Sequence, residues 1–257
     1  MAHEFFRITR VKLALLLPGA GFLLLELILE PAALKLALPG LIIWGLLYYV
    51  AASVAVTLRS RRAHLPRFRL LLGYAVLLAT LDQLLKFIVL HRLPLEQEQT
   101  LIPAALTLTH THNLQGSWVA AQFGLDFIGD TFLITLSLFF TLLAISLYRY
   151  YVDRRGQPNL WTATAMVGFV AGFSSAFVEL ALRGYTVDYL GFAGLVVADL
   201  KDFYLDIAIA AFFAEFVENY DAARRMSSKE TILHVTGALA LSAQEIEALF
   251  RRKRQIP

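Results

Sequence analysis

Two acidic residues in the C-terminal half of the chain lie within apolar stretches, where a charge is costly. Glu179 and Asp206 stand in consecutive apolar segments. These segments run antiparallel if both cross a bilayer, which puts the two carboxyl groups at a similar depth. Two close carboxyl groups in a dry site share a proton, so one acts as base toward water and the other as acid. One interpretation is therefore an acidic dyad able to hydrolyse an amide. The alternative is two unrelated acids that reach toward the membrane interface.

A second pair of charges stands in an earlier apolar segment. Asp82 and Lys86 are four residues apart, so they share one face of a helix and are able to neutralise each other. Opposite charges within lipid are less costly together than alone. We predict a structural ion pair that faces the interior of a helix bundle, in preference to a catalytic role.

Polar residues with a strand-like alternation lie between two apolar segments. Residues 106–112 read Leu-Thr-Leu-Thr-His-Thr-His, and Asn113 follows them. An Asn near a glycine-containing turn usually serves the turn; the alternative is an amide that binds a peptide backbone. His110 and His112 share one strand face, but the nearby sequence offers no third ligand, so we predict no metal site.

The fold that must position these residues is a membrane-embedded helix bundle. The chain has 257 residues, of which 58% are hydrophobic and 17% charged. This composition excludes a disordered chain and leaves no room for a large soluble domain beside the spans. Six stretches are long and apolar enough to cross a bilayer. They lie at about 13–29, 37–58, 69–90, 131–148, 161–182 and 203–220. We predict an all-α membrane protein of six transmembrane helices, with a small β/loop cradle in the segment 91–130 on the periplasmic side.

The distribution of Lys and Arg predicts the orientation of the spans. Most basic residues lie before the first span, between spans two and three, between spans four and five, and after the last span. Both termini are therefore expected in the cytoplasm. The same segments account for the formal net charge of +3, so we expect no nucleic-acid partner. The chain has no cysteine, which excludes a disulfide and a thiol nucleophile.

The C-terminal segment 221–257 is polar and basic. Ser242 and Glu245 have the spacing of a capping box, and the basic run Arg251-Arg252-Lys253-Arg254 follows. We predict a short amphipathic helix that rests on anionic lipid headgroups. Docking to a membrane-protein partner is the alternative.

Four short segments resemble, in order, the conserved boxes of signal peptidase II, the lipoprotein signal peptidase family. They are Leu81–Lys86, Leu106–Asn113, Arg183–Tyr189 and Asp206–Ile209. The resemblance covers about 69–220 and implies the four-helix core of that family there. Two additional helices would then occupy 1–68, and 221–257 would be a cytoplasmic tail. The resemblance also implies the bacterial inner membrane as the location.

The resemblance implies an activity as well. In this family two aspartates cut the bond before a lipid-modified cysteine of a prolipoprotein, just inside the outer surface of the membrane. Carried over, the second catalytic aspartate falls on Asp206 and the first on Glu179. The resemblance implies no cofactor, and it implies a substrate-binding role for further residues of the outer segments. These residues are Asn113, Gln115, Arg183 and Asp188.

The chain departs from the family pattern around the predicted dyad. Glu179 stands where the family has an aspartate, and the Asn and Arg beside it are replaced by Ala176 and Leu180. Gln115 replaces a glycine, and Phe203 replaces the Asn that normally lies three residues before the second aspartate. A displacement of about 1 Å at a reacting group costs about a hundredfold in rate, so these changes bear directly on activity.

Two hypotheses follow from these departures. The first is a divergent aspartic endopeptidase that acts on lipid-modified prolipoproteins. The second is a catalytically inactive scaffold of the same fold, which binds a lipidated protein, a lipid or a membrane-protein partner through the first two helices or the basic tail. A small transporter ranks last, because the chain shows no internal repeat and no matched pair of broken helices.

Overall fold

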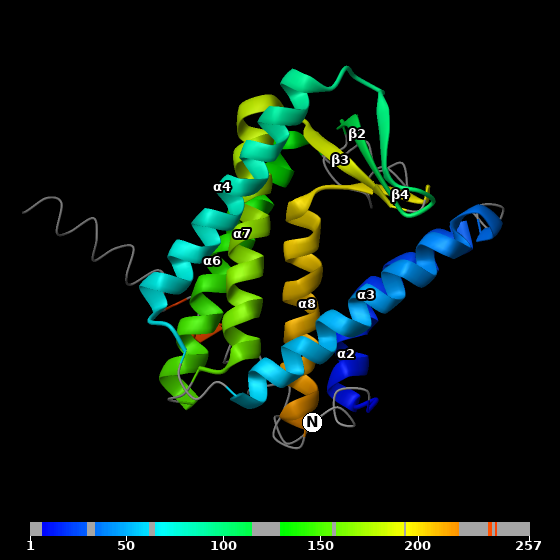
Figure 1. The fold of residues 1–257 in the computed structure, drawn as a ribbon. Coiled ribbons are helices and arrows are strands. Elements are labelled where there is room, and N and C mark those ends of the chain that lie inside the picture. The colour runs from blue at the N-terminus through cyan, green and yellow to red at the C-terminus, as the bar shows by residue number, and fades with distance from the viewer. Residues whose placement is uncertain are drawn as a thin grey trace, which may run out of the picture.

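A computed structural model describes residues 7–29, 34–61, 65–114, 129–155, 158–192 and 194–220, together with 236, 237 and 240. Gln115 and nearly all of the segment 221–257 lie outside these ranges, so their predicted roles stay predictions. Within the described part, the molecule is mostly helical and carries one small antiparallel sheet at an end of the helix bundle (Figure 1).

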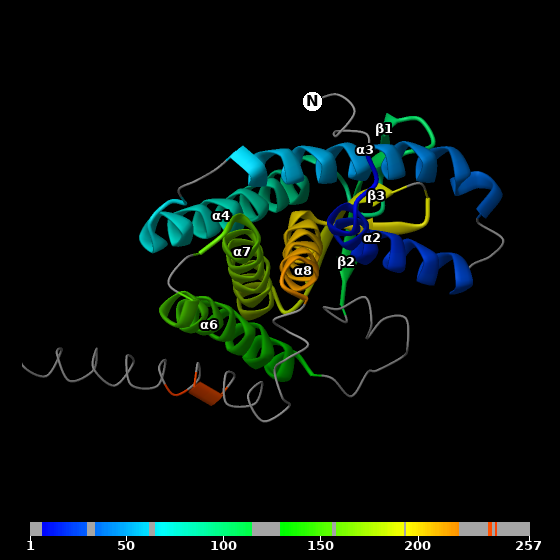
Figure 2. The same ribbon diagram turned by 90° about the horizontal axis from the view of Figure 1, so that it is seen from below.

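Four helices form the body of the bundle. They are α4 (Phe68–Arg92), α6 (Asp130–Arg155), α7 (Leu160–Arg183) and α8 (Leu200–Glu218). Helix α7 lies between α4 and α6 and also packs along α8, as Figure 2 shows from below. The buried core between these helices includes Leu71, Ala75, Met166, Val170 and Tyr204. Because α7 contacts every other member, its residues are the natural place for groups that link the bundle.

Two glycines bring α7 and α8 unusually close. A Cβ built on Gly168 would lie 2.5 Å from the carbonyl oxygen of Tyr204, and one on Gly172 would lie 2.6 Å from Cγ of Leu205. Small residues four apart allow helix backbones to approach in membranes. This contact holds the first turns of α8 beside the middle of α7.

Local sequence signals fix where these two helices begin and end. Asn159 and Thr162 form a reciprocal capping box at the start of α7, and Gly184 ends it in the left-handed conformation with φ 73°. Asp199 and Asp202 form the same reciprocal box at the start of α8. Helix α8 therefore starts earlier than the predicted 203–220 and brings Asp202 into its first turn.

The small sheet joins the two segments that the sequence places outside the membrane. Its strands are β1 (Glu98–Ile102), β2 (Leu106–Asn113), β3 (Thr186–Phe192) and β4 (Val196–Ala198), antiparallel in the order β1-β2-β3-β4. The predicted strand at 106–112 is confirmed as β2. Its partner β3 was not predicted, and it places Asp188 opposite Thr111.

Helices α2 (Arg10–Leu29) and α3 (Leu34–Arg61) pack against the core rather than apart from it. Figure 2 shows α2 alongside α8, on the side away from α6. Trp44 on α3 donates a hydrogen bond from Nε1 to the carbonyl of Ala105 at 3.0 Å, and its ring lies 4.7 Å from that of Phe192. The added helices thus contact both the bundle and the sheet.

Four helices of the described part are long and apolar enough to cross a membrane. These stretches are Leu38–Arg59, Phe68–Arg92, Asp130–Asp153 and Leu160–Arg183. The predicted spans at 13–29 and 203–220 do form helices, α2 and α8, but neither is among these four. Six transmembrane helices therefore stay a prediction.

Candidate active site

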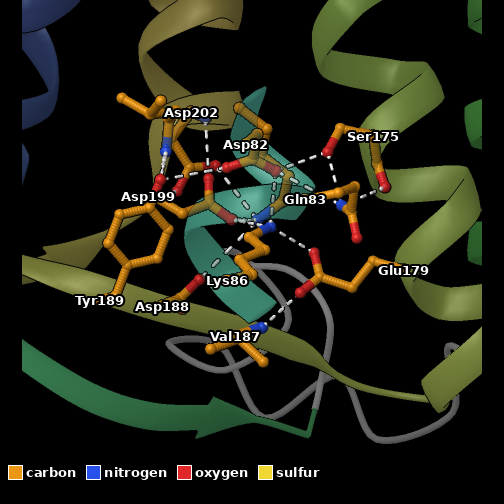
Figure 3. Close-up of polar contacts among 12 residues, drawn as sticks. Asp82, Gln83, Lys86, Ser175, Glu179, Val187, Asp188, Tyr189, Asp199 and Asp202 are labelled. Carbon is orange, nitrogen blue, oxygen red and sulfur yellow. Dashed lines mark hydrogen bonds and ion pairs between the residues drawn. The ribbon is translucent and has the colours of Figure 1, made fainter. Parts of the chain in front are cut away.

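A buried ammonium group organises the polar interior where α4, α7, β3 and α8 meet (Figure 3). Nζ of Lys86 lies 3.0 Å from Asp82, 2.5 Å from Glu179 and 2.5 Å from Asp199. All four side chains are fully buried. The contact predicted from the spacing of Asp82 and Lys86 is present, but it is part of a larger network that spans three elements.

Asp82 is satisfied on both oxygens. Ser175 donates to Oδ2 at 2.5 Å, and Tyr189 donates to Oδ1 at 3.3 Å. Gln83 holds Ser175 in turn, through a hydrogen bond of 2.8 Å from Nε2 to Oγ. A carboxylate with this many partners and no exposure connects α4 to α7 and β3, which fits a structural role.

Glu179 is likewise enclosed by partners. Besides Lys86, it accepts a hydrogen bond of 2.6 Å from the backbone N–H of Val187 and an ion pair of 3.5 Å from Arg183. Arg183, predicted to bind substrate, also donates to Gln83 at 3.3 Å. Both oxygens of Glu179 are thus engaged in linking α7 to α4 and β3.

Asp206 lies on a different set of contacts. Its Oδ2 accepts a hydrogen bond of 3.3 Å from Tyr48 on α3, and a Cβ built on Gly19 of α2 would lie 3.4 Å from the same oxygen. Among the contacts of the described residues, no hydrogen bond or ion pair joins Asp206 to Glu179. The predicted dyad of these two residues stays a prediction that no such contact supports.

The structure brings a different set of carboxyl groups together. One oxygen from each of Asp188, Asp199 and Asp202 lies within 4.8 Å of the others. Asp188 and Asp199 are buried, whereas the side chain of Asp202 keeps 46% of its exposure. Asp202 is therefore the member of this group that solvent or a bound molecule reaches.

Each member is held by the local structure of its element. Asn113 on β2 donates from Nδ2 to Oδ2 of Asp188 on β3 at 3.2 Å. At the start of α8, the N–H of Asp202 donates to Asp199 at 3.1 Å and the N–H of Asp199 donates to Asp202 at 3.2 Å. The sheet register and the helix cap therefore bring Asp188 and Asp202 to the same point.

Lys201 supplies a positive charge within this acidic group. Its Nζ is bonded to Asp199 and lies 3.7 Å from Oδ1 of Asp188 and 3.9 Å from Oδ1 of Asp202. Three carboxylates are a ligand set typical of a divalent cation. Here an ammonium group already contacts all three, and its charge opposes the entry of a second cation.

The surroundings separate these carboxyl groups in acidity. Burial raises the pKa of Asp188 against the opposing charge of Lys201, and the charge of Asp199 adds to the rise. The pKa of Asp202, whose side chain stays 46% exposed, is raised by partial removal from water and by the charge of Asp199. Burial would raise the pKa of Asp199 too, but Lys201 and Lys86 outweigh it and hold that pKa below its usual value. Asp199 is thus the ionised member, and Asp188 and Asp202 are the two suited to share a proton.

Sequence reasoning placed Asp188 among the substrate-binding residues and did not select Asp199, Lys201 or Asp202. One signal was available: two aspartates three residues apart at the start of an apolar segment form a helix cap. That cap places both residues at the start of α8. The proximity of Asp188 to them depends on the β3–α8 connection, which no short-range pattern reveals.

The chain matches the family model described as signal peptidase (SPase) II over residues 74–218, more than half of its length. This chain belongs to the signal peptidase II family. The match lies within the predicted core 69–220 and leaves α2 and α3 outside it. The chain is accordingly a membrane protein of a hydrolase family that processes lipoproteins.

Curated relatives agree with this assignment, and solved structures agree with the fold. Lipoprotein signal peptidases of Streptococcus pyogenes, from the serotype M5 strain Manfredo and the serotype M3 strain MGAS315, are 25% identical over 143 residues, which is 55% of this chain and 88% of theirs. Two structures of a bacterial membrane enzyme, determined by the in meso method at 2.3 and 1.9 Å resolution, share the fold. The first has a TM-score of 0.51 and 19% identity, covering 62% of this chain and 94% of the other. The second has a TM-score of 0.50 and 20% identity, covering 59% of this chain and 95% of the other.

Proposed function

We propose that this signal peptidase II-type protein is an aspartic endopeptidase whose catalytic pair is Asp188 and Asp202. The observation that carries the proposal is that carboxylate oxygens of the two residues lie within 4.8 Å of each other. A water molecule between two oxygens at this separation is able to hydrogen-bond to both. The pair replaces the Glu179–Asp206 dyad predicted from sequence, since Glu179 is engaged by Lys86 and Val187 and Asp206 by Tyr48.

The chemistry requires one shared proton. The ionised carboxylate removes a proton from the water while the water oxygen bonds to the scissile carbonyl carbon. The π electrons of the carbonyl group move onto the carbonyl oxygen. The protonated carboxyl donates its proton to that oxygen, which gives a neutral tetrahedral diol. On collapse, the first carboxyl returns its proton to the leaving amide nitrogen, the C–N bond breaks, and the second carboxylate recovers its proton from the diol.

Asn113 is suited to hold the substrate beside this pair. Its Nδ2 is bonded to Asp188, whereas its Oδ1 is buried and has no hydrogen-bond partner among the described residues. A buried acceptor without a partner is costly, and the N–H of a substrate backbone would satisfy it. This supports the predicted substrate-binding role of Asn113. For Arg183, the contacts with Gln83 and Glu179 favour positioning of the bundle.

The proposed substrate is a lipid-modified prolipoprotein, cut before its modified cysteine. Family membership and the relatives named lipoprotein signal peptidase support this substrate class. The proposed setting is the bacterial inner membrane, with six spans, both termini in the cytoplasm and the sheet on the periplasmic side. The distribution of Lys and Arg in the sequence supports this orientation.

Four variants distinguish the two possible acidic pairs. The assay is cleavage of a lipid-modified prolipoprotein peptide by the purified full chain in detergent or lipid. Asp188→Asn and Asp202→Asn should each lower kcat by at least about a hundredfold, the range expected for losing an acid or base. Asp206→Asn should keep most activity. The matched change Glu179→Gln should act mainly through stability.

Two results would contradict the assignment of Asp188 and Asp202 as the catalytic pair. Full activity in Asp202→Asn, or loss of activity in Asp206→Asn with unchanged folding, would return the chemistry to the Glu179–Asp206 dyad. Thermal unfolding of each variant in the same detergent separates a chemical defect from a folding defect.

A non-catalytic binding protein is the second candidate. The observation that favours it is the contact of Lys201 with all three carboxylates, because a nearby ammonium group favours the ionised forms and so opposes the proton that an acid must hold. Under this hypothesis the wild-type chain binds the lipidated peptide but releases it uncut. The cleavage assay decides between the two candidates.

A further inference from the structure

Lys201 is a buried lysine that contacts the proposed catalytic pair directly. Only 7% of its side chain is exposed, and its Nζ lies 3.7 Å from Asp188 and 3.9 Å from Asp202. Among the residues that the structure describes, no other cation forms an ion pair with either carboxylate. We propose that Lys201 is a positioning residue whose ammonium group sets the protonation state of the Asp188–Asp202 pair, and with it the pH range of cleavage. The proposal rests on the proposed function.

The other charges around the pair are already committed to one another. Lys86 is satisfied by Asp82 and Glu179, and Arg183 by Glu179 and Gln83. Two neutral polar groups among the described residues bond members of this network. They are Tyr189, which bonds Asp82, and Asn113, which bonds Asp188.

Asp199 connects the two lysines. It is fully buried, lies 2.5 Å from Lys86 and is bonded to Lys201. It therefore belongs to both the structural network and the site. Its negative charge opposes the effect of Lys201 on the pair. Removing the charge of Asp199 should therefore shift the apparent pKa values of the pair in the direction opposite to removing the charge of Lys201.

The direction of each change follows from electrostatics. A cation near a carboxyl group favours the ionised form and lowers its pKa, and an anion raises it. The catalytic pair works only with one shared proton, so activity lies between two apparent pKa values that belong to the pair. Removing the charge of Lys201 raises both values and moves the active range to higher pH. Removing the charge of Asp199 moves it to lower pH.

The experiment is the pH profile of cleavage in three variants of the full-length protein. Lys201→Met should move both limbs of the profile to higher pH by about one unit. Solvent around the half-exposed Asp202 screens the charge of Lys201, so this shift is smaller than the one expected for a fully buried charge at the same distance. Lys201→Arg keeps the charge and should leave the limbs in place. Asp199→Asn, which keeps an excellent helix cap, should move them downward.

A second readout does not depend on activity. Protonated carboxyl groups have an infrared C=O band, and its titration in the wild type and in Lys201→Met reports the pair directly, with Asp188→Asn and Asp202→Asn identifying the band. The titration should move upward in Lys201→Met. If that variant fails to fold, Lys201→Gln supplies the same comparison, and Asp199→Asn should move the titration in the opposite direction.

The outcomes separate the two proposals. Cleavage in the wild type with unmoved limbs in Lys201→Met, or an equal shift in Lys201→Arg, overturns the role of Lys201 and leaves the peptidase in place. Absence of cleavage in the wild type overturns the peptidase. In that case an unchanged infrared titration overturns the role of Lys201, and an upward shift supports it.

Discussion

Lys86 places one positive charge among three carboxylates in a part of the molecule without solvent. Its contacts with Asp82, Glu179 and Asp199 join α4, α7 and the start of α8. Burying charges is costly, but removing one partner from an assembled network is costlier, because the remaining charges are left uncompensated. The single lysine therefore determines whether three separate elements pack together.

Loss of this charge should destabilise the fold strongly. We expect Lys86→Met to lower the free energy of unfolding by about 3–5 kcal/mol, the range for breaking a buried ion pair. The matched control is Arg59→Met, whose ion pair with Glu218 at 3.4 Å lies in a partly exposed setting and should cost no more than about 1 kcal/mol. Denaturant unfolding of both variants in one detergent measures the difference. Equal losses would contradict the role of Lys86.

Residue contacts were predictable from sequence only where they are local. The spacing of Asp82 and Lys86 correctly indicated a shared helix face. Glu179 looked available for catalysis because its partners Lys86 and Val187 come from other elements. Asp206 was assigned to the dyad from its depth and from the family resemblance of Asp206–Ile209, and its partner Tyr48 lies on α3, outside the matched residues 74–218.

At the scale of elements, the close contact of α7 and α8 depends on glycine. Gly168 has no space for a Cβ, which would meet the carbonyl oxygen of Tyr204 at 2.5 Å. Gly73 on α4 has no heavy atom within 4 Å of the same position. The two sites therefore test the effect of one methyl group with and without a neighbour.

Alanine at these two positions should have opposite effects. Gly168→Ala forces α8 away from α7 and should cost about 1–3 kcal/mol, as overpacking does, with a parallel loss of cleavage because Asp202 moves relative to Asp188. Gly73→Ala should be neutral or stabilising by about 0.5–1 kcal/mol, since Ala is the better helix former. Thermal unfolding and the cleavage assay measure both effects. A Gly168→Ala protein as stable as Gly73→Ala would show that the contact is not tight.

The elements themselves were largely predictable, and their ends less so. All six apolar segments form helices, and β2 occupies the predicted strand with Asn113 added. Strand β3 was missed because it pairs with β2 across more than seventy residues of sequence (Thr111 with Asp188) and contains a glycine. The capping box at Asp199 starts α8 before the predicted limit, which places Asp202 within the helix.

At the scale of the whole molecule, the side chain of Trp44 on α3 links the added N-terminal helices to the sheet. Trp44 contacts Ala105 by a hydrogen bond and Phe192 by its ring, and Phe192 in turn lies 5.1 Å from the ring of Phe203 on α8. The chain of aromatic contacts runs from α3 through the sheet to the first turns of α8.

Removing Trp44 should loosen the sheet while the bundle stays intact. We expect Trp44→Ala to raise hydrogen exchange of the β1 and β2 amides by about tenfold or more, because a partly buried hydrogen bond and an aromatic contact are both lost. Leu46→Ala is the control, since that side chain keeps 62% of its exposure. Hydrogen-exchange mass spectrometry in detergent tests this, and unchanged exchange in Trp44→Ala would contradict the link.

The proposed orientation is directly measurable because the chain has no cysteine. A single cysteine at Glu98→Cys, in the exposed strand β1, should react with a membrane-impermeant maleimide added outside the inner membrane. Arg67→Cys, just before α4, should react only after the membrane is permeabilised. The positive-inside distribution predicts this pattern, and the reverse pattern would invert the topology.

The left-handed turn at Gly184 has a consequence for which bond is cut. Helix α7 ends at Arg183 and β3 begins at Thr186, so the connection between them is very short. The connection from β4 to α8 is similarly short. With α7 and α8 crossing the membrane as proposed, the lengths of these two helices determine the height of Asp188 and Asp202 above the bilayer centre. A lipid anchored in the membrane likewise fixes the height of the peptide attached to it. The scissile bond would thus be chosen by its distance from the acyl chains as much as by the identity of neighbouring side chains.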